Sequence, residues 1–500
     1  MGFLPFFSLE TWALLVMFIS LFIMYGYWSY GVFEKLGIPC PKPIMYWGTV
    51  TKGHSVYYIK DYMSFKQFGK VWGMYELRTP MLAVMDVSML KTILVKECFS
   101  LFPNRRNLRL NGDLYDIVSL SEDDNWRRIR NILTPAFTTG RIKEMFEIMK
   151  QHSRKLTDSL RPKAHNEEVI NVKDFLGAYS LDAMASCAYS IDTDTIKDPS
   201  HPFINHAKKL LRISIPLFLI QGFFPFLLPL LEISGFSLFP KSCVAYFKSV
   251  LEKVRAERRG GSHQMDFLQL MMNSQQEKQN KGLSDHEIMS QAIIFVAAGF
   301  DTSGTTLAFL AYNLAKNPEV MRRLQEEIDT TFPSKVKQES VFQYTDSLYT
   351  EYKYLCFIIR LYPPIARIER VAKATVEING ITVPKDMIVT VPVYALHRDP
   401  DLWPDPEEFK PDRFSKENKQ SINPYAYLPF GIGPRNCIGM RFALVMVKLA
   451  LVEVLQNYSF SICKETEIPL EMDPTGLLGP LRPIKLKLVA RSIASANVDN

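Results

Sequence analysis

One cysteine lies in a glycine-rich loop directly before an apolar segment. The loop reads PFGIGPRNCIG, from Pro429 to Gly439, with the cysteine at position 437. From Ile438 onward no proline occurs until after Leu455, which predicts a helix that begins at the loop. A thiolate stays deprotonated where backbone N–H groups and a helix N-terminus surround it. Because such a thiolate is a strong, electron-donating ligand for haem iron, the loop predicts a haem-thiolate centre at Cys437 rather than an inert buried cysteine.

Other residues of this loop fit the same chemistry. Gly431, Gly433 and Gly439 allow the backbone to fold tightly around the sulfur. Arg435 carries a guanidinium that can pair with a haem propionate. Phe430 offers an aromatic ring that can shield the sulfur. An inert cysteine would not need this combination of residues, so the pattern is specific.

A long apolar segment, Leu283–Lys316, contains an acid and an alcohol near its centre. It begins with a capping-box pattern, Ser284 and Glu287, and its length predicts one helix of roughly 45–50 Å at 1.5 Å per residue. A transmembrane helix is one interpretation, but Asp301 at its centre would be costly in lipid. A core helix that passes a reactive centre explains Asp301 and Thr302 better.

The same helix has the composition of a wall beside a cofactor. The small residues Ala298 and Gly299 would let a flat cofactor approach the backbone, and a local widening of the helix is common at functional sites. Asp301 and Thr302 would then relay protons to a group bound above them. A threonine in a helix often only bonds its own backbone carbonyls, so these residues alone are suggestive and no more.

Together these motifs resemble those of the cytochromes P-450. The stretch FGIGPRNCIG, 430–439, is similar to the haem-binding signature of that family. AGFDTS at 298–303, WRRIR at 126–130 and PDRF at 411–414 are similar to its oxygen-activation, propionate-binding and meander motifs. A finer resemblance is to the 3A subfamily, the broad-specificity drug and steroid oxidases of the endoplasmic reticulum. LVKEC, FPNRR, EEIDTTFPSK, VEINGITVPK, YALHRDP and GPRNCIGMRFAL carry it.

The resemblance implies a role for each residue of these motifs. Haem b would be the cofactor, with Cys437 as the axial ligand of its iron. Asp301 and Thr302 would be the catalytic residues, and Ser119 and Ile294 would face the substrate. The other residues implied to bind the cofactor are Arg105, Trp126, Arg130, Ala298 (which would also face the substrate), Arg370, Phe430, Arg435 and Gly439.

The implied activity is a monooxygenation that inserts one oxygen atom from O2 into apolar small molecules such as steroids, drugs and other xenobiotics. The chain has no GxGxxG motif opening a βαβ unit and no flavin motif, so electrons must come from outside. The resemblance assigns them to NADPH through the NADPH-cytochrome P-450 reductase, with cytochrome b5 as a further candidate partner. Candidates for the docking face, equally well explained as ordinary surface charges, are Arg127, Arg128, Arg441 and Lys448.

One departure from the family pattern is serious. The family has an ExxR motif whose Glu and Arg form a buried structural triad with the arginine of the meander motif. Arg360 and Arg413 supply the two arginines, but Phe357 stands where the glutamate is expected. Glu351, nine residues before Arg360, lies about half a turn off that face at 100° per residue and is a poor substitute. The resemblance lapses from roughly 336 to 359 and then resumes.

Three functional hypotheses therefore remain from the sequence. The first is an active microsomal monooxygenase. The second is an inactive or poorly haem-loaded relative, which Phe357 favours. The third is a haem-thiolate isomerase or peroxygenase that needs no reductase, and the acid–alcohol pair of Asp301 and Thr302 speaks against it.

The N-terminus has the properties of a membrane anchor. Thr11–Tyr30 contains no charged residue and has about the 20 residues that a bilayer span needs. A cleaved signal peptide is the rival, but the segment lacks a basic n-region and a small-residue cleavage site. Glu10 precedes the span and Lys35 follows it, so the positive-inside rule predicts a cytosolic body. With the resemblance, this predicts an endoplasmic reticulum membrane protein whose catalytic domain faces the cytosol.

The segment Ile215–Phe239 is apolar all round and is interrupted by three prolines. A bilayer span with so many breaks is disfavoured. It is either a core segment or a lid that dips into the membrane and lines an apolar pocket, and the lid is favoured.

The rest of the chain predicts one large, mainly α-helical domain with small β-sheets, an α+β fold. We expect a membrane anchor over 1–33 and a single haem-thiolate catalytic domain, the cytochrome P-450 fold, over 34–500. Helices are predicted at Thr51–Phe68, Trp126–Arg161 and Leu283–Lys316, and strands near 70–78, 371–383 and 387–396. The net charge of +7 includes no long basic run, which argues against a nucleic-acid partner. Seven scattered cysteines without a CxxC pair argue against a disulfide framework or a zinc ribbon.

Overall fold

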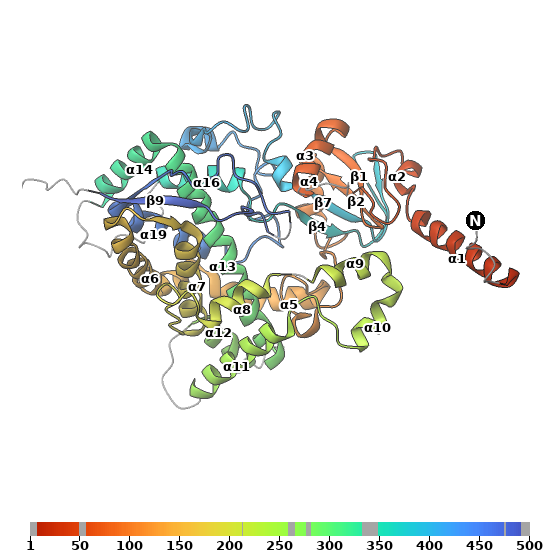
Figure 1. Cartoon of the computed structure of the whole chain (residues 1–500), viewed down its shortest axis with the longest axis horizontal. Coiled ribbons are helices and arrows are strands. Elements are labelled where there is room, and N and C mark those ends of the chain that lie inside the picture. Colours follow the sequence, from red (N-terminus) through yellow and green to blue (C-terminus); the bar gives the residue numbers. More distant parts are fainter. Residues whose placement is uncertain are drawn as a thin grey trace, which may run out of the picture.

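The computed structural model describes residues 8–49, 57–212, 214–258, 266–276, 282–332, 349–474 and 477–491. Over these residues the chain is mainly helical, with small sheets at one end and at the edge of the helical body (Figure 1). This confirms the predicted fold class.

The largest sheet joins segments that are far apart in the sequence. Its strand order is β1-β2-β7-β4, and its strands are β1 (Val71–Glu76), β2 (Thr79–Val84), β7 (Ile388–Val391) and β4 (Ile368–Val371). β1 and β2 form an antiparallel hairpin, β7 runs parallel to β2, and β4 is antiparallel to β7. The smaller sheets are β3 (Val169–Asn171) with β9 (Lys485–Ala490) and β8 (Tyr458–Ser461), and β5 (Val376–Ile378) with β6 (Ile381–Val383). The predicted strand regions contain β1, β5, β6 and β7, whereas β2, β3, β4, β8 and β9 were not predicted.

The helix α13 (Asp285–Lys316) crosses the middle of the molecule (Figure 1). Ser284 caps it, and the Ser284 and Glu287 side chains each accept a hydrogen bond from the other residue's backbone N–H, as the capping box predicts. α13 is long and apolar enough to cross a membrane, but it is mostly buried inside the protein. It packs closely against α7 (Val172–Tyr189). The interpretation as a core helix is therefore confirmed.

Two predicted helices have different bounds. The region Trp126–Arg161 is not one helix: α5 (Asp123–Leu133) ends before a 3₁₀ turn, Thr134–Phe137, and α6 (Thr139–His165) follows. Pro135 accounts for the break, because its ring has no N–H and clashes with the preceding turn. Of the helix predicted at Thr51–Phe68, α3 covers Tyr57–Phe68, and residues 51–56 lie outside the described residues.

The remaining described elements complete the helical body. The helices are α2 (Val32–Lys35), α4 (Val87–Lys91), α8 (Pro202–Leu210), α11 (Lys241–Arg258), α12 (Phe267–Asn273), α14 (Pro318–Thr331), α16 (Tyr349–Leu361), α17 (Val393–Leu396), α18 (Lys416–Lys419) and α19 (Met440–Asn457). A π-helical turn covers Thr92–Lys96, and further 3₁₀ turns cover Gly112–Leu114, Ser274–Gln276 and Pro411–Phe414.

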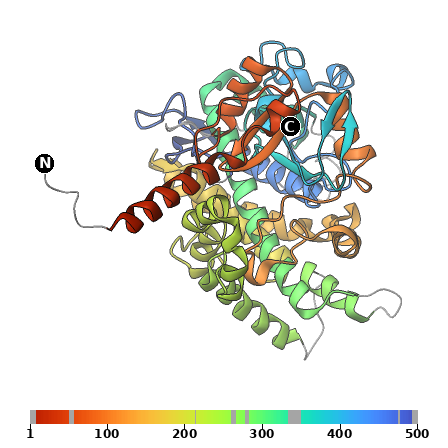
Figure 2. The ribbon, with the colours of Figure 1, turned by 90° about the vertical axis from the view of Figure 1, so that its right-hand side faces the viewer.

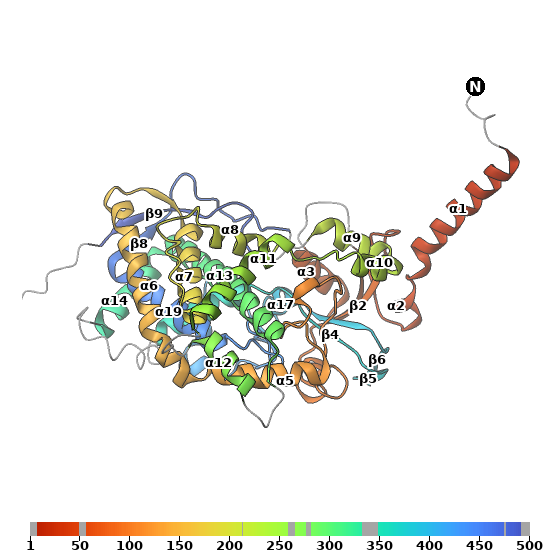
Figure 3. The same cartoon turned by 90° about the horizontal axis from the view of Figure 1, so that it is seen from below.

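The helix α1 (Leu9–Trp28) extends away from the body (Figures 2 and 3). Its apolar side chains are exposed, and its length and hydropathy suit a membrane span. Near its C-terminal end the Tyr25 hydroxyl donates to the Phe223 carbonyl (3.1 Å), and the Arg78 guanidinium lies 3.5 Å from the centre of the Tyr25 ring. α1 thus contacts the body through the apolar segment that contains Phe223, and also through Tyr46, whose hydroxyl donates to the Phe22 carbonyl (2.6 Å).

That apolar segment is divided by its prolines into α9 (Ile215–Phe223), a 3₁₀ turn (Pro225–Leu227) and α10 (Leu228–Ile233). Several large apolar side chains are exposed on it, namely Ile215, Phe226, Leu230, Ile233 and Phe236. Figures 1 and 3 show it on the side of the molecule from which α1 leaves. The interpretation as a core segment is wrong, and an apolar surface beside the anchor remains.

The contact between α13 and α7 can be tested with a glycine-to-alanine substitution, in which overpacking lowers stability and higher helix propensity raises it. A Cβ atom added at Gly304 would lie 2.8 Å from the Gly177 Cα, closer than such atoms approach. We expect Gly304→Ala to lower the thermal unfolding midpoint, because overpacking costs about 1–3 kcal/mol and exceeds the gain of about 1 kcal/mol in helix propensity.

The control is Gly140→Ala in α6, where an added Cβ meets no atom within 4 Å. This variant should raise the midpoint slightly. If Gly304→Ala were as stabilising as Gly140→Ala, the close approach of the two helices would be wrong.

Candidate active site

The loop before α19 folds tightly around Cys437. The Cys437 N–H donates to the Phe430 carbonyl (2.8 Å), and the Asn436 N–H donates to the Gly433 carbonyl (3.1 Å). Gly433 has φ +77°, and a Cβ there would lie 2.0 Å from the Leu94 carbonyl oxygen, so only glycine fits. Gly439 is the N-cap residue of α19, which begins at Met440, two residues later than predicted.

The Cys437 thiol has the surroundings of a metal ligand. Cys437 keeps solvent-accessible surface although protein atoms surround its thiol closely enough to desolvate it, a combination that indicates an internal space beside the sulfur. Burial raises the pKa of the thiol, while the Gly439 N–H and the charges of Arg130 and Arg105 act to lower it. A metal cation bound to the sulfur would lower the pKa of the thiol further, because a coordinating thiol is deprotonated outright.

In the middle of helix α13 one stripe is not fully covered by protein. Ala298 is exposed, and Ile294 and Thr302 are half-buried, whereas Val296 and Phe300 are fully buried. The three uncovered residues follow one another at spacing i, i+4, so they share one face of the helix. This face borders a space inside the fold.

The proposed catalytic pair makes two separate contacts. Asp301 forms an ion pair with Lys173 of α7, with 2.7 Å between Oδ1 and Nζ. The Thr302 hydroxyl donates to the Ala298 carbonyl (2.7 Å). The predicted widening of the helix is wrong: α13 is α-helical throughout, and the Thr302 hydroxyl supplements its regular hydrogen bonds instead of interrupting them.

Arg435, in the loop itself, is buried and bonds only neutral groups. Its Nη2 donates to the Ser121 carbonyl (2.9 Å) and the Asn104 side chain (3.2 Å), and its Nε donates to the Pro103 carbonyl. Its guanidinium lies 4.1 Å from the centre of the Trp126 ring. Trp126 is therefore placed to support Arg435.

Three further arginines gather around the same loop. Arg105 donates to the Arg435 carbonyl (3.2 Å), and Arg130 donates to the carbonyl and side-chain oxygens of Asn436 (3.0 and 2.9 Å). Arg370, on β4, is buried and donates to the Glu369 carbonyl (2.8 Å), while its Nε has no hydrogen-bond partner.

Within the described residues, none of these four arginines pairs with a carboxylate. Burial and the neighbouring charges of Arg105 and Arg370 lower the pKa of Arg435 to about 9. Burial and Arg105 likewise lower the pKa of Arg370 to about 10. The cluster thus needs an anionic ligand, and the two propionates of haem b supply negative charges that fit it.

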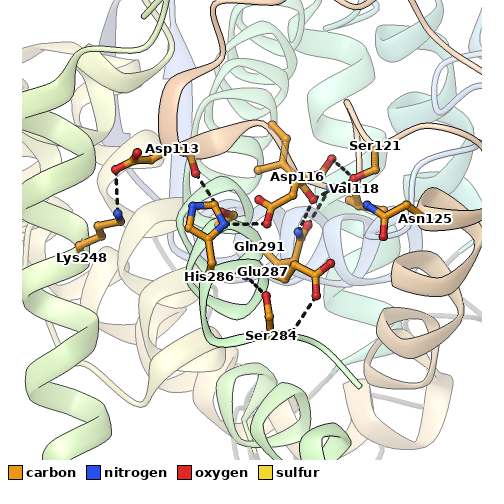
Figure 4. A network of polar contacts seen from close by, with 12 residues as sticks. Asp113, Asp116, Val118, Ser121, Asn125, Lys248, Ser284, His286, Glu287 and Gln291 are labelled. Atoms are coloured by element: carbon orange, nitrogen blue, oxygen red, sulfur yellow. Dashed lines mark hydrogen bonds and ion pairs between the residues drawn. The ribbon is translucent and has the colours of Figure 1, made fainter. Parts of the chain in front are cut away.

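The segment before α5 connects this cluster with α13. The Val118 N–H donates to Oε1 of Gln291 on α13 (2.7 Å), and the Gln291 side chain donates back to the Asp116 carbonyl (2.8 Å) (Figure 4). Three residues later the Ser121 carbonyl receives the Arg435 hydrogen bond. Ser119, half-buried, lies between these two attachments.

The structural arginines lack the expected carboxylate. Arg360, completely buried on α16, donates to the carbonyls of His397 (2.6 Å) and Pro406 (2.7 Å), and its Nε has no partner. Its guanidinium lies 5.0 Å from the centre of the Phe357 ring. Burial, followed by the charges of Arg398 and Arg413, lowers the pKa of Arg360 to about 9.

Arg413, in the 3₁₀ turn Pro411–Phe414, donates to the Asp405 carbonyl (2.7 Å), and its Nε is also without a partner. Phe357 is completely buried and packs edge-on against Phe409. The side chain of Glu351 lies outside the described residues. In the described part of the chain no carboxylate hydrogen-bonds Arg360 or Arg413.

The candidate docking residues differ in position. Arg441 is exposed, and Arg127 pairs with Asp124 at the surface (2.9 Å). Arg128 pairs with Glu287 of α13, and Lys448 is buried. The prediction that Lys448 belongs to a docking face is therefore wrong, since a buried ammonium is not available to a partner.

The family model of cytochrome P450 matches residues 38–488 of the chain. This chain belongs to the cytochrome P450 family. It is 54% identical to cytochrome P450 3A27 of Oncorhynchus mykiss over 512 residues, covering 99% of this chain and 98% of the relative. It is also 54% identical to cytochrome P450 3A40 of Oryzias latipes over 508 residues, 99% of this chain and 100% of the relative. With cytochrome P450 3A12 of Canis lupus familiaris the identity is 47% over 502 residues, 98% and 99% of the two chains.

Family membership confirms the resemblance drawn from the motifs. The chain is a member of a family of monooxygenases that bind haem b, and its loop, arginine cluster and uncovered α13 stripe fit that cofactor. The sequence did not indicate Lys173 as the partner of Asp301, because no motif joins residues 128 positions apart. Asn104 and Asn436, which bind Arg435 and Arg130, lie in the quoted FPNRR and GPRNC stretches and could have been identified there.

The arginine cluster predicts opposite effects of one substitution on the haem-free and haem-bound proteins. Arg105→Met removes a charge that repels Arg435 and Arg370. We expect the haem-free protein to be no less stable, and haem affinity to fall about 10- to 100-fold, because a hydrogen bond to a charged group contributes about 1.5–3 kcal/mol.

Haem titration and thermal unfolding of the haem-free protein measure the two effects, with Arg441→Met on the surface as the control. If Arg105→Met destabilised the haem-free protein and left haem affinity unchanged, the cluster would be a structural feature and not a cofactor site.

Proposed function

We propose that this chain is a microsomal haem-thiolate monooxygenase that oxidises apolar small molecules, including steroids and xenobiotics, with electrons from NADPH supplied by a reductase. The observation that carries the proposal is the group of four arginines without carboxylate partners around the Cys437 loop. Such a group favours binding of a dianionic cofactor directly beside a thiol that a metal would ionise.

Each part of the site has a share in holding haem b. Cys437 would bind the iron, the Gly439 N–H would stabilise the thiolate, and Phe430 would shield it. Arg105, Arg130, Arg370 and Arg435 would bind the propionates, with Trp126 behind Arg435. When bound, haem supplies the oxygen activation, and the electron donation of a thiolate ligand favours O–O cleavage.

The Asp301–Lys173 pair and Thr302 suit the delivery of protons. The side chains of Asp301 and Lys173 are 23% and 34% exposed, so the pair exchanges protons with water. Thr302 lies next to Asp301 on the uncovered stripe of α13. Its hydroxyl now donates to the Ala298 carbonyl, and rotation about one side-chain bond frees that proton for a group in the internal space.

Substrate would meet mostly apolar surface. Ile294 and Ala298 would present aliphatic carbon to the substrate, and Ser119, half-buried on the segment bound to α13, would add a hydroxyl. Burial contributes about 25 cal/mol per Å2 of apolar area and has little directional preference. This composition favours a broad range of apolar substrates over one polar compound.

Electron supply and membrane attachment complete the proposal, and family membership supports both. NADPH-cytochrome P450 reductase is the expected donor, and cytochrome b5 is proposed as a second. Arg127 and Arg441 remain candidates for the docking face. α1 and the apolar segment α9–α10 would lie in the endoplasmic reticulum membrane, with the catalytic domain on the cytosolic side because Lys35 follows the span.

A second candidate function, an inactive or poorly haem-loaded relative, is favoured by Arg360. A buried charge that has lost its partner costs about 3–5 kcal/mol. Carbonyl hydrogen bonds and the contact with the Phe357 ring offset part of this, since a desolvated cation–π pair contributes about 2 kcal/mol. Whole-domain stability is about 5–15 kcal/mol, so the remaining cost is large enough to reduce the fraction of folded, haem-loaded chain.

Turnover tests the proposed function directly. The full chain in phospholipid vesicles with reductase, NADPH and ¹⁸O2 should convert testosterone to products that carry one ¹⁸O atom. Thr302→Val should lower product per NADPH at least 10-fold, because a positioned proton donor contributes about 10²–10⁴-fold.

Thr306→Val is the matched control, since Thr306 makes the same type of bond, to the Thr302 carbonyl (2.8 Å), on the same helix. Equal loss in both variants would remove Thr302 from proton delivery. No labelled product from haem-loaded wild-type protein would contradict the monooxygenase assignment.

The missing carboxylate gives a further prediction. Phe357→Glu should raise the thermal unfolding midpoint and the haem content, because a carboxylate would then lie beside the Arg360 guanidinium, whose Nε is unpaired. The gain should stop short of full loading, since the whole stretch from roughly 336 to 359 departs from the family.

Phe357→Gln, which has the size of glutamate without its charge, is the control. Full haem content in Phe357→Glu would show that the defect is confined to this one position. Equal effects of Glu and Gln would contradict the role of charge.

A further inference from the structure

One face of α7 contacts the part of α13 that carries the candidate catalytic pair (Figure 1). The contacting residues of α7 are spaced i, i+4, i+7 and i+11, a spacing that places them on the same side of a helix. They are Lys173, Gly177, Ser180 and Met184. Their partners on α13 are Asp301 and two glycines that flank the pair, Gly299 and Gly304. α7 therefore holds this segment of α13 at several points.

Ser180 forms a hydrogen bond between the two helices. Its side chain is completely buried, and its hydroxyl donates to the Gly299 carbonyl (3.0 Å). A serine inside a helix often donates to the carbonyl of the residue four positions before it on its own helix. Ser180 donates to α13 instead, so its hydroxyl links the backbone of α13 to α7.

Gly299 is a backbone position at which such a restraint matters. A glycine in a helix has more conformational freedom to lose than any other residue. A Cβ atom at this position would lie 2.2 Å from the Met184 Cε, so the glycine lets α7 pack directly on the backbone of α13. The Ser180 hydroxyl thus restrains the residue of this turn whose backbone is least restrained by its own side chain.

Two successive carbonyls of this turn accept side-chain hydroxyls. The Ala298 carbonyl accepts from Thr302 of the same helix (2.7 Å), and the next carbonyl, that of Gly299, accepts from Ser180. Before Thr302 can donate to a bound group, its hydroxyl must leave the Ala298 carbonyl while the turn between them keeps its place. Because Gly299 lies inside that turn, the bond from Ser180 is placed to hold it while the Thr302 hydroxyl rotates.

Lys173 contacts the same turn in a less rigid way. Its Nζ lies 2.7 Å from Oδ1 of Asp301, the residue directly before Thr302. Both side chains of this ion pair are partly exposed, and ion pairs of that kind contribute little to fixed geometry. The bond from Ser180 is buried and acts on the backbone itself. Ser180 is therefore the stronger restraint on the position of Thr302.

We propose that Ser180 is a positioning residue for proton delivery: it holds the Gly299 carbonyl and thereby fixes the turn of α13 from which Thr302 donates. This role rests on the proposed function. Ser180 is buried between the helices and acts through Thr302. Since a displacement of about 1 Å in a reacting group can lower a rate about 100-fold, one hydrogen bond is enough to influence turnover.

Amide hydrogen exchange in the purified full chain tests the restraint without requiring turnover. Ser180→Ala should speed exchange in segment 298–304 of α13 about 2- to 12-fold, the factor that one net hydrogen bond between neutral groups contributes. Ser186→Ala is the matched control, because Ser186 is also buried on α7 and its hydroxyl donates to a carbonyl outside α13, that of Ile191 (2.8 Å). In the control, exchange in segment 298–304 should stay at the wild-type rate.

Turnover of testosterone connects the restraint with Thr302. Ser180→Ala should lower product per NADPH about 2- to 12-fold, while haem content and testosterone affinity stay at the wild-type values. In the Thr302→Val background the same substitution should have no further effect, because a residue that acts through Thr302 has no donor left to position. Ser186→Ala should leave product per NADPH unchanged in both backgrounds.

Equal exchange rates in wild type and Ser180→Ala would overturn the proposal. Equal effects of Ser180→Ala and Ser186→Ala would show a general loss of α7 packing and would overturn it too, as would a further loss of product when Ser180→Ala is added to Thr302→Val. A wild-type chain that forms no product but shows the Ser180-specific change in exchange would reject the proposed function and keep Ser180 as the residue that holds the turn.

Discussion

The site depends on the repulsion among buried and half-buried arginines that surround one cysteine. Arg105, Arg130 and Arg370 approach the Cys437 loop from three separate parts of the chain, and Arg435 belongs to the loop itself. Backbone carbonyls and asparagine side chains are their hydrogen-bond acceptors. Such acceptors satisfy N–H groups without neutralising charge, so the cluster is costly until an anion enters. Haem b carries two carboxylates for the arginines and a cation for the thiol. Binding of this one group therefore relieves the arginine repulsion and ionises the sulfur, which couples stability to the cofactor.

A second buried cation has no such ligand. Arg360 is completely buried, and its guanidinium faces an aromatic ring, Phe357, at the position where the family pattern has a carboxylate. A ring offers a weak attraction and no hydrogen-bond acceptor for Nε. The two groups of charges thus differ. Cofactor binding can neutralise the arginines around Cys437, whereas no carboxylate in the described structure neutralises Arg360. The chain therefore combines an intact Cys437 loop with a buried arginine, Arg360, that lacks its carboxylate partner.

How much the sequence could predict depended on the distance over which each signal acts. The Cys437 loop, the capping box of Ser284 and the long apolar N-terminal helix are local patterns, and all appear in the structure. The Asp301–Lys173 pair joins α13 to α7, and β4 pairs with β7 through a crossover, so neither has a local signature. The break at Pro135 was available from the sequence, because a proline inside a helical segment ends or kinks the helix. Burial of Lys448 arises only when α19 enters the core, because its charge alone predicts a surface position.

The reduced, carbon monoxide-treated spectrum of the purified full chain, measured beside that of Cys437→Ser, tests the central claim most directly. We predict a strongly red-shifted Soret band, typical of thiolate ligation, in the wild-type chain and its loss in the serine variant. The unreplaced arginine cluster should leave some haem bound in that variant. A spectrum typical of histidine-ligated haem in the wild type, or identical spectra in the two proteins, would contradict the account.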